Sequence, residues 1–344
     1  MKFDHNNISP LDSRYANKIP EFRKNFSEYS LIKIRFDIEI DWLIFLCTKL
    51  PKLFKPISKQ SIKKLELFKN DFNDKYVLKI KKIEATTNHD VKAVEYFIRD
   101  HFNKDKTLSG YTHLIHFGLT SEDINSLSYA YLVKNGIKLF ANEVSIINKT
   151  LKSYSSKWSK ISFLARTHGQ PASPSTIGKE LKVFSSRIDR EIKTLKTIKP
   201  LAKFSGATGN FHTFDIVDNK VNWPTINKKF IHQFGIEQNL YTTQIEPHDW
   251  IAEVSHSIVR INNILTDLCQ DSWIYISNDI FALKLQKNEV GSSTMPHKVN
   301  PIDFENAEGN FGISSSLCEF YANKLTKSRH QRDLSDSTVL RNLG

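Results

Sequence analysis

One stretch near the end of the chain, GSSTMPHKVNP at residues 291–301, combines residue types that could carry out proton transfer. A glycine and three hydroxyl side chains lead into a histidine and a lysine, and Pro296 and Pro301 limit the flexibility of the segment. Such a strip can bring backbone N–H donors and the fixed charge of Lys298 to a place where negative charge develops. A merely flexible linker would need neither Lys298 nor Asn300.

Five more polar clusters lie in or beside predicted breaks between helices. They are TTNHD (86–90), LTSED (119–123), RTHGQPASPS (166–175), TTQIEPHD (242–249) and RHQRDLSDSTVLR (329–341). Each has a structural explanation, such as a helix N-cap at Thr120 or Ser121, or a hydrogen-bonded structural histidine at His89 or His168. The number of these clusters, in a chain otherwise made of plain helix, favours a functional site.

Long apolar stripes between the breaks predict the elements that must position these clusters. Apolar residues alternate steps of three and four from Ser121 towards Lys160, over 177–198, and from Pro247 to about Lys287, where the helix would be roughly 60 Å long. Residues 31–40, LIKIRFDIEI, alternate like a strand, but the absence of breakers favours helix. We expect an all-α fold with a smaller N-terminal helical domain (1–110) and a long-helix bundle domain (111–344) that is shared between subunits.

Composition narrows the classes of function. The formal charge of +12 attracts anions, but lysines between 49 and 82 are interleaved with acidic and apolar residues, so a nucleic-acid partner is not expected. No signal peptide and no membrane span is predicted, and the cytoplasm is the expected location. Cys47, Cys269 and Cys318 have no CxxC spacing and are expected in the core. His113 and His116 lack a third ligand, so no metal site is predicted.

The motifs, in their order along the chain, resemble those of the adenylosuccinate lyase family of the fumarase/aspartase superfamily. They are TTNHDVKAVEYF, THLIHFGLTSEDIN, ARTHGQPASPSTIGKE, YTTQIEPHD, GSSTMPHKVNP and RDLSDSTVLRN, and the similarity runs from about Ser9 to the last residue. The resemblance implies helical homotetramers with active sites shared between subunits, and it implies no cofactor and no metal. It also implies anti elimination of fumarate from adenylosuccinate and from succinylaminoimidazole-carboxamide ribotide, in purine biosynthesis.

The resemblance assigns roles to matching positions. Ser292 matches the general base, His168 the general acid, and Glu305 the carboxylate that orients the acid. His89 matches a second active-site histidine, and Lys298 the cation that stabilises the base and the developing charge. The matching substrate-binding positions are Arg14, Tyr15, Asn88, His89, Asp90, Thr120, Ser121, Gln244, Ser293, Lys298, Val299, Asn300, Asn306, Arg332, Ser337, Thr338, Val339, Leu340 and Arg341.

Two alternatives stay open. Another fumarate-releasing lyase of the superfamily, such as argininosuccinate lyase, would share the loop at 291–301. A shortened, inactive subunit that acts only in assembly is the second, because the chain stops at Gly344 where the family continues into a further helical domain. We expect a C-terminally truncated form of this kind to assemble but to bind nucleotide weakly, because Arg332, Ser337 and Arg341 lie near its last helix end.

Overall fold

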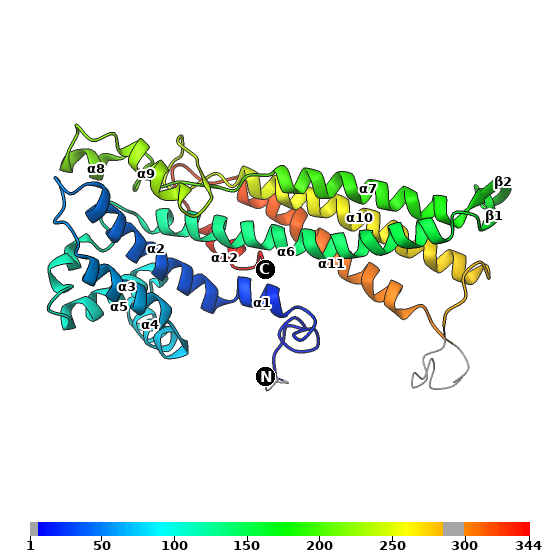
Figure 1. Ribbon diagram of the computed structural model, residues 1–344, viewed down its shortest axis with the longest axis horizontal. Coiled ribbons are helices and arrows are strands. Elements are labelled where there is room, and N and C mark those ends of the chain that lie inside the picture. The colour runs from blue at the N-terminus through cyan, green and yellow to red at the C-terminus, as the bar shows by residue number, and fades with distance from the viewer. Residues whose placement is uncertain (1–5, 285–298) are drawn as a thin grey trace. The chain divides into compact units, whose positions relative to one another are not determined.

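A computed structural model describes residues 6–284 and 299–344 of the chain (Figure 1). The expected all-α class is confirmed, with two short strand pairs added to the helices. Contacts group the chain into two compact units: unit 1 comprises residues 1–139, 199–248 and 327–344, and unit 2 comprises 140–198 and 249–326. These units do not follow the boundary expected near residue 110, which stays a prediction.

Unit 1 is built from short and medium helices. Its helices are α1 (Pro20–Phe26), α2 (Glu28–Lys49), α3 (Lys59–Asn70), α4 (Asp74–Thr87), α5 (Asp90–Lys104), the 3-10 helix η1 (Ser109–Leu114), the first half of α6 (Ser121–Lys157), α8 (His212–Val217), α9 (Trp223–His232) and α12 (Ser335–Leu340). Two-residue strands β3 (Leu201–Ala202) and β4 (Glu237–Gln238) pair in parallel.

The helix predicted over 31–40 lies inside α2. Its apolar and polar residues alternate like those of a strand because the burial of α2 does not follow one face. Thirteen of the 22 residues of α2 are buried, among them Arg35 and Glu39, so the helix is enclosed on most sides and needs no single apolar stripe. Ser27 begins it as the N-cap, accepting a hydrogen bond from the Ser30 N–H. Trp42 is fully buried at the centre of unit 1 and its indole N–H donates to the Phe117 carbonyl at 2.9 Å.

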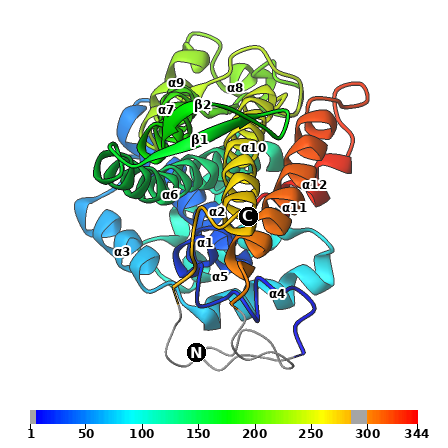
Figure 2. The same cartoon turned by 90° about the vertical axis from the view of Figure 1, so that its right-hand side faces the viewer.

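Unit 2 is a bundle of long helices. It contains the second half of α6, α7 (Ile177–Thr197), α10 (Asp249–Ser277) and α11 (Ile302–Leu325), with α10 lying beside α7 and α11 (Figures 1 and 2). Asn262 on α10 donates to Ser314 on α11 at 3.1 Å, and Arg260 pairs with Glu191 on α7 at 2.8 Å. The helices predicted from 121 and over 177–198 are confirmed.

The third long helix ends earlier than predicted. It stops at Ser277 and not near Lys287, because Asp279 takes a left-handed conformation (φ 56°). The N–H of Ile280 then folds back to the Tyr275 carbonyl at 2.9 Å, the closure typical of a helix C-terminus. Glycine usually occupies such a position, so an aspartate gave no warning in the sequence.

A β-hairpin occupies the segment that was predicted only as a break. β1 (Ser162–Thr167) pairs antiparallel with β2 (Gln170–Thr176), and α7 follows directly (Figure 2). His168 and Gly169 form its turn, both with positive φ (54° and 73°). The hairpin thereby carries His168 at an exposed tip.

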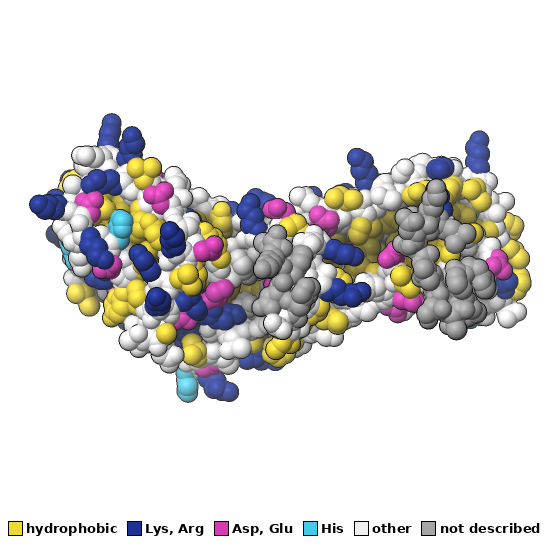
Figure 3. Space-filling model, turned by 90° about the horizontal axis from the view of Figure 1, so that it is seen from below, with side chains coloured by type: hydrophobic (Ala, Val, Ile, Leu, Met, Phe, Trp, Pro, Cys, Tyr) yellow, Lys and Arg dark blue, Asp and Glu magenta, His cyan; other side chains and the backbone are white. Residues whose placement is uncertain are grey.

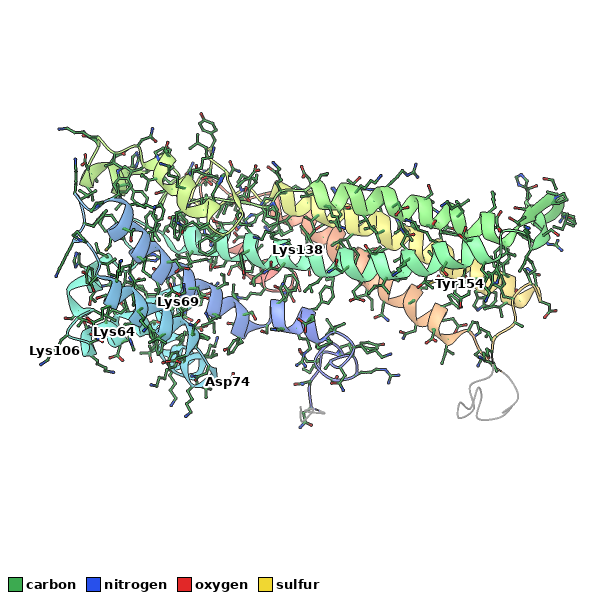
Figure 4. The ribbon with its side chains drawn as sticks, in the orientation of Figure 1. Lys64, Lys69, Asp74, Lys106, Lys138 and Tyr154 are labelled. Atoms are coloured by element: carbon green, nitrogen blue, oxygen red, sulfur yellow. The ribbon has the colours of Figure 1, made fainter. Side chains whose placement is uncertain are left out.

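Several charged side chains of unit 1 form ion pairs. Figure 3 shows lysines and arginines mixed with acidic and apolar side chains, and Figure 4 labels Lys64 and Lys69 on α3. Lys64 pairs with Asp105 at 2.8 Å and Lys69 with Asp41 at 2.6 Å. All three cysteines are buried, as predicted. Across the described ranges, none of the helices combines the length and the apolar character needed to cross a membrane.

Candidate active site

The motif TTNHD forms the junction between α4 and α5. Asn88 ends α4 in the left-handed conformation (φ 50°), which asparagine tolerates better than most residues. His89 is the N-cap of α5, and its Nδ1 accepts from the Lys92 N–H at 3.2 Å. The other ring nitrogen, Nε2, lies 3.3 Å from Oγ of Ser121. The junction therefore places a histidine and a serine from two distant motifs side by side.

Asp90 fixes two arginines at the same junction. Its Oδ2 pairs with Nη1 of the buried Arg35 at 2.9 Å and with Nη2 of Arg341 at 2.5 Å. Burial raises the pKa of Asp90, but Arg35, the Val91 N–H and Arg341 more than offset it and hold that pKa below its usual value. Arg341 also contacts Glu28 at 3.0 Å, so its guanidinium bridges two carboxylates. Asp90 thus acts here as a permanent anion that orients Arg341.

A buried ion pair supports the start of α6. Oδ2 of Asp123 accepts from the Thr120 N–H at 2.8 Å, which is an N-terminal cap. Oδ1 of Asp123 pairs with Nζ of Lys203 at 2.8 Å, and both side chains are fully buried. Nζ of Lys203 also donates to the carbonyl oxygens of Gly206 and Gln244, both at 2.8 Å. One ammonium therefore ties the LTSED motif to the TTQIEPHD motif.

Arg332, in the last polar cluster (residues 329–341), contacts two carboxyl groups of this region. Its Nη1 contacts both carboxylate oxygens of Asp336, at 3.0 and 2.8 Å, and its Nη2 lies 3.3 Å from Oε2 of Glu122. The Gln244 N–H donates to the Gln331 carbonyl at 3.3 Å, which joins the two loops through their backbones.

A cavity of about 460 Å³ opens among these motifs within unit 1. This size lies within the usual range for a small-molecule site. Nine predicted substrate-binding residues line it, namely Asn88, His89, Asp90, Thr120, Ser121, Gln244, Arg332, Ser337 and Arg341. The other lining residues are Glu84, Glu122, Asn125 and Leu334. Two arginines, a histidine and several hydroxyl and amide groups suit a ligand that carries phosphate and carboxylate groups.

The remaining predicted residues of unit 1 do not line this cavity. Arg14 and Tyr15 belong to the turns before α1, where the Tyr15 N–H donates to the Pro10 carbonyl at 2.8 Å. Thr338, Val339 and Leu340 lie on α12, and the last two are buried.

The other predicted residues belong to unit 2 or lie outside the described residues. His168 lies at the hairpin tip, and Nη1 of Arg166 donates to the Gly169 carbonyl beside it at 3.0 Å. Glu305 is in the first turn of α11 and accepts from the Trp273 indole at 3.1 Å. Asn306 follows it, and Val299 and Asn300 precede the helix. Ser292, Ser293 and Lys298 lie outside the described residues.

Sequence reasoning missed Lys203, Asp336 and the deeper role of Asp123 and Glu122. LTSED indicated a helix cap, and the cap is present, but the sequence around Lys203 (PLAKFSG) gives only a weak indication that its ammonium is buried. A lysine between apolar residues in a glycine-rich segment was the one available signal.

Among the described residues, one group of three has the geometry to hold a cation. Glu122, His248 and Asp336 are all buried, and one polar atom of each lies within 4.8 Å of the others. The guanidinium of Arg332 already contacts both carboxylates, so a fixed positive charge occupies this neighbourhood.

Comparisons with known proteins agree with the geometry. A family model described as Lyase matches residues 13–312. Adenylosuccinate lyase of Legionella pneumophila (strain Corby) is 47% identical over 342 residues, which is 98% of this chain and 75% of that protein. The chain belongs to the adenylosuccinate lyase family. The Escherichia coli (strain K12) member of the family is 43% identical over 343 residues, with 98% of this chain and 74% of that protein covered.

Solved structures share the fold of these lyases. Fumarate lyase from Mesorhizobium sp. BNC1 superposes with a TM-score of 0.75 at 16% identity, covering 94% of this chain and 69% of that one. The 3-carboxy-cis,cis-muconate lactonizing enzyme from Pseudomonas putida also gives 0.75, at 17% identity, covering 94% and 71%.

Proposed function

We propose that the protein is an adenylosuccinate lyase that releases fumarate from adenylosuccinate, giving AMP, and from succinylaminoimidazole-carboxamide ribotide, giving the aminoimidazole-carboxamide ribotide. The observation that carries the proposal is the cavity in unit 1, which gathers nine predicted residues from four separate motifs. Relatives at 43–47% identity over 98% of the chain carry the same name. Both observations point to one substrate class.

Elimination of fumarate needs a base, an acid and stabilisation of a dianionic intermediate. The proton to be removed sits beside a carboxylate, so its carbon is a very weak acid. We assign Ser292 as the base, with Lys298 and backbone N–H groups stabilising the charge that develops. His168 protonates the leaving nitrogen, and Glu305 orients His168. Each proton transfer of this kind contributes about 100- to 10,000-fold to the rate.

The cavity in unit 1 is proposed to hold the substrate. Arg332 and Arg341 are fixed by carboxylates on one side, and each guanidinium has further N–H donors to offer to a phosphate. His89 and Ser121 lie close enough to share a ligand oxygen. Because these groups are already ordered by protein contacts, binding costs little further side-chain entropy.

We propose that the protein works as a homotetramer whose subunits complete one another's sites. Ile313, Leu317 and Phe320 on α11 expose 65%, 46% and 51% of their surface, which is a large apolar face for a single chain. The cavity in unit 1 is lined by neither His168 nor Glu305, and in the superfamily such residues come from other subunits. The cytoplasmic location expected from the sequence stays a prediction.

Fumarate formation tests the proposal and separates it from both alternatives. The chain is incubated with adenylosuccinate, with the imidazole substrate and, as control, with argininosuccinate. Fumarate from the first two alone is the expected result. Release from argininosuccinate alone would assign another lyase of the superfamily, and release from none would favour the inactive assembly subunit.

Mixing inactive variants tests the shared site. Ser292→Ala and His168→Gln chains, each inactive alone, are combined after reversible dissociation. If a site takes Ser292 and His168 from different subunits, random mixing restores both residues in about a quarter of the sites. Activity that stays at the level of the separate variants would contradict sharing.

A further inference from the structure

The cluster of Glu122, His248 and Asp336 lies directly behind Arg332 and has no role in the chemistry described so far. Glu122 is 3% exposed, His248 is 2% exposed and Asp336 is 5% exposed. They come from α6, from the loop before α10, and from α12. The TTQIEPHD motif was singled out in the sequence, yet only its glutamine was given a function.

Two polar atoms of this cluster are left without partners. Within the described part of the chain, neither Oε1 of Glu122 nor Nδ1 of His248 makes a hydrogen bond, although both are buried. Such atoms are costly in a protein interior. A buried carboxyl oxygen without a donor costs more when the group is ionised, so the missing donor at Oε1 favours the neutral form of Glu122.

The contacts of Arg332 distinguish the two carboxyl groups. Asp336 receives two bonds from Nη1, the shorter at 2.8 Å, which is the length of a charge-assisted hydrogen bond. Oε2 of Glu122 lies 3.3 Å from Nη2, which is longer than a charge-assisted hydrogen bond of about 2.7–2.9 Å. Asp336 therefore behaves as the anionic partner of Arg332, and Glu122 as the neutral one.

The histidine is held in place by its backbone. His248 has a left-handed conformation (φ 65°), which is unfavourable for a residue with a side chain, and its N–H donates to Oε2 of Glu246 at 2.8 Å. Oε1 of Glu246 is in turn held by Asn239 at 2.8 Å. These contacts hold the imidazole in the cluster, with a ring nitrogen within 4.8 Å of a carboxyl oxygen of Glu122.

We propose that Glu122, His248 and Asp336 form a positioning cluster in which Glu122 carries a proton, His248 is a neutral neighbour, and Arg332 is left with Asp336 as its one anionic partner. With Glu122 neutral, the guanidinium can bind an anionic ligand group. Ionised Glu122 would add a second negative charge against Arg332 and weaken that binding.

The charged surroundings agree with this assignment. Burial is the largest cause that raises the pKa of Glu122, to about 7, and the carboxylate of Asp336 on α12 raises it further. The pKa is lowered in part by Arg332, by Asn125 on the same helix and by Lys203, which follows β3. Burial lowers the pKa of His248 to about 4, so the imidazole is neutral near neutral pH. The proton therefore belongs to Glu122 in the free protein.

Infrared spectroscopy on the ligand-free protein tests where the proton is. At pH 6 the wild type should show the C=O stretch of a buried protonated carboxyl group, and this band should be missing in Glu122→Gln. The band should also fade as the pH rises through 7. An identical spectrum in the variant would overturn the proposal.

The role in binding is tested with AMP, and this part rests on the proposed function. The dissociation constant of AMP in the wild type should rise by up to about ten-fold for each pH unit above 7, and Glu122→Gln, which resembles the protonated carboxyl group, should lose that rise. Glu84→Gln is the matched control, because Glu84 lines the same cavity but pairs with Lys81 at 2.8 Å; it should keep the rise.

A second variant leaves Glu122 in place. Asp336→Asn removes the like charge, so the pH at which AMP binding weakens should move downward. An unshifted profile in Asp336→Asn, or an unchanged rise in Glu122→Gln, would contradict the positioning role. If AMP bound to none of the proteins, the proposed nucleotide site would be wrong, and the infrared band would still decide where the proton lies.

Discussion

Replacing Lys203 with methionine should destabilise the protein far more than a typical substitution. Methionine keeps most of the length of the side chain and removes only the ammonium group. That group is fully buried, pairs with Asp123 at 2.8 Å and donates to the carbonyl oxygens of Gly206 and Gln244. The variant therefore leaves the Asp123 carboxylate buried without its cation and two carbonyl groups without that donor.

The magnitude follows from these contacts. Removing one partner of a buried ion pair costs about 3–5 kcal/mol, because the remaining charge stays desolvated. Asp123 keeps the N–H donors of Thr120, Ser205 and Gly206, which compensate part of its charge. We therefore expect a loss near the lower end, about 3 kcal/mol in the free energy of unfolding.

Urea unfolding followed by circular dichroism measures this loss, with Lys199→Met as the matched control. Lys199 lies four positions earlier and pairs with Glu237 at 2.7 Å, but its side chain is 69% exposed. Its substitution should cost less than about 1 kcal/mol. The Lys203 variant should also raise KM, since Gln244 loses its anchor. A cost for Lys203→Met no larger than that of the control would refute the reasoning.

Four further predictions concern single side chains. Ser292→Ala should lower kcat by several orders of magnitude while AMP still binds in calorimetry; near-normal turnover would reassign the base. His168→Gln should lose most of the rate, and near-normal turnover in this variant would exclude His168 as the acid. Arg341→Lys should weaken AMP binding by about ten-fold, because it loses the paired donors that also reach Glu28 and Asp90; equal affinity would contradict this. The raised pKa of Glu122, about 7, adds to the free energy of unfolding at low pH. This contribution, about 3 kcal/mol in all, is complete below pH 4.5 and is lost as the pH rises through 7. The free energy of unfolding of Glu122→Gln should lack this pH dependence.

Much of the fold could be predicted because periodicity reports burial directly. α6 and α7 begin and end within a few residues of the predicted bounds, since each keeps one apolar stripe between clear breakers. The end of α10 could not be predicted, because it depends on the left-handed conformation of Asp279. The hairpin at 162–176 was also missed, as its strands are mostly exposed and carry two prolines, which gives no alternating pattern.

The residues that line the candidate site could be predicted from the sequence, and the residues that hold them in place could not. Residues that contact the cavity, such as His89 and Arg332, stand in motifs whose order resembles a known family, and nine of them meet in unit 1. The groups that hold those residues were not predicted. Lys203 pairs with Asp123 and Glu122 with Arg332, partners far away in the sequence, so their roles depend on tertiary contacts that no local pattern reports.

A crystal structure of the protein with AMP bound tests the central claim most directly. The account predicts AMP in the cavity of unit 1, with its phosphate in contact with Arg332 or Arg341 and with His89 and Ser121 facing the place of the departed fumarate. AMP bound elsewhere on the protein, with this cavity empty, would contradict the assignment of the active site.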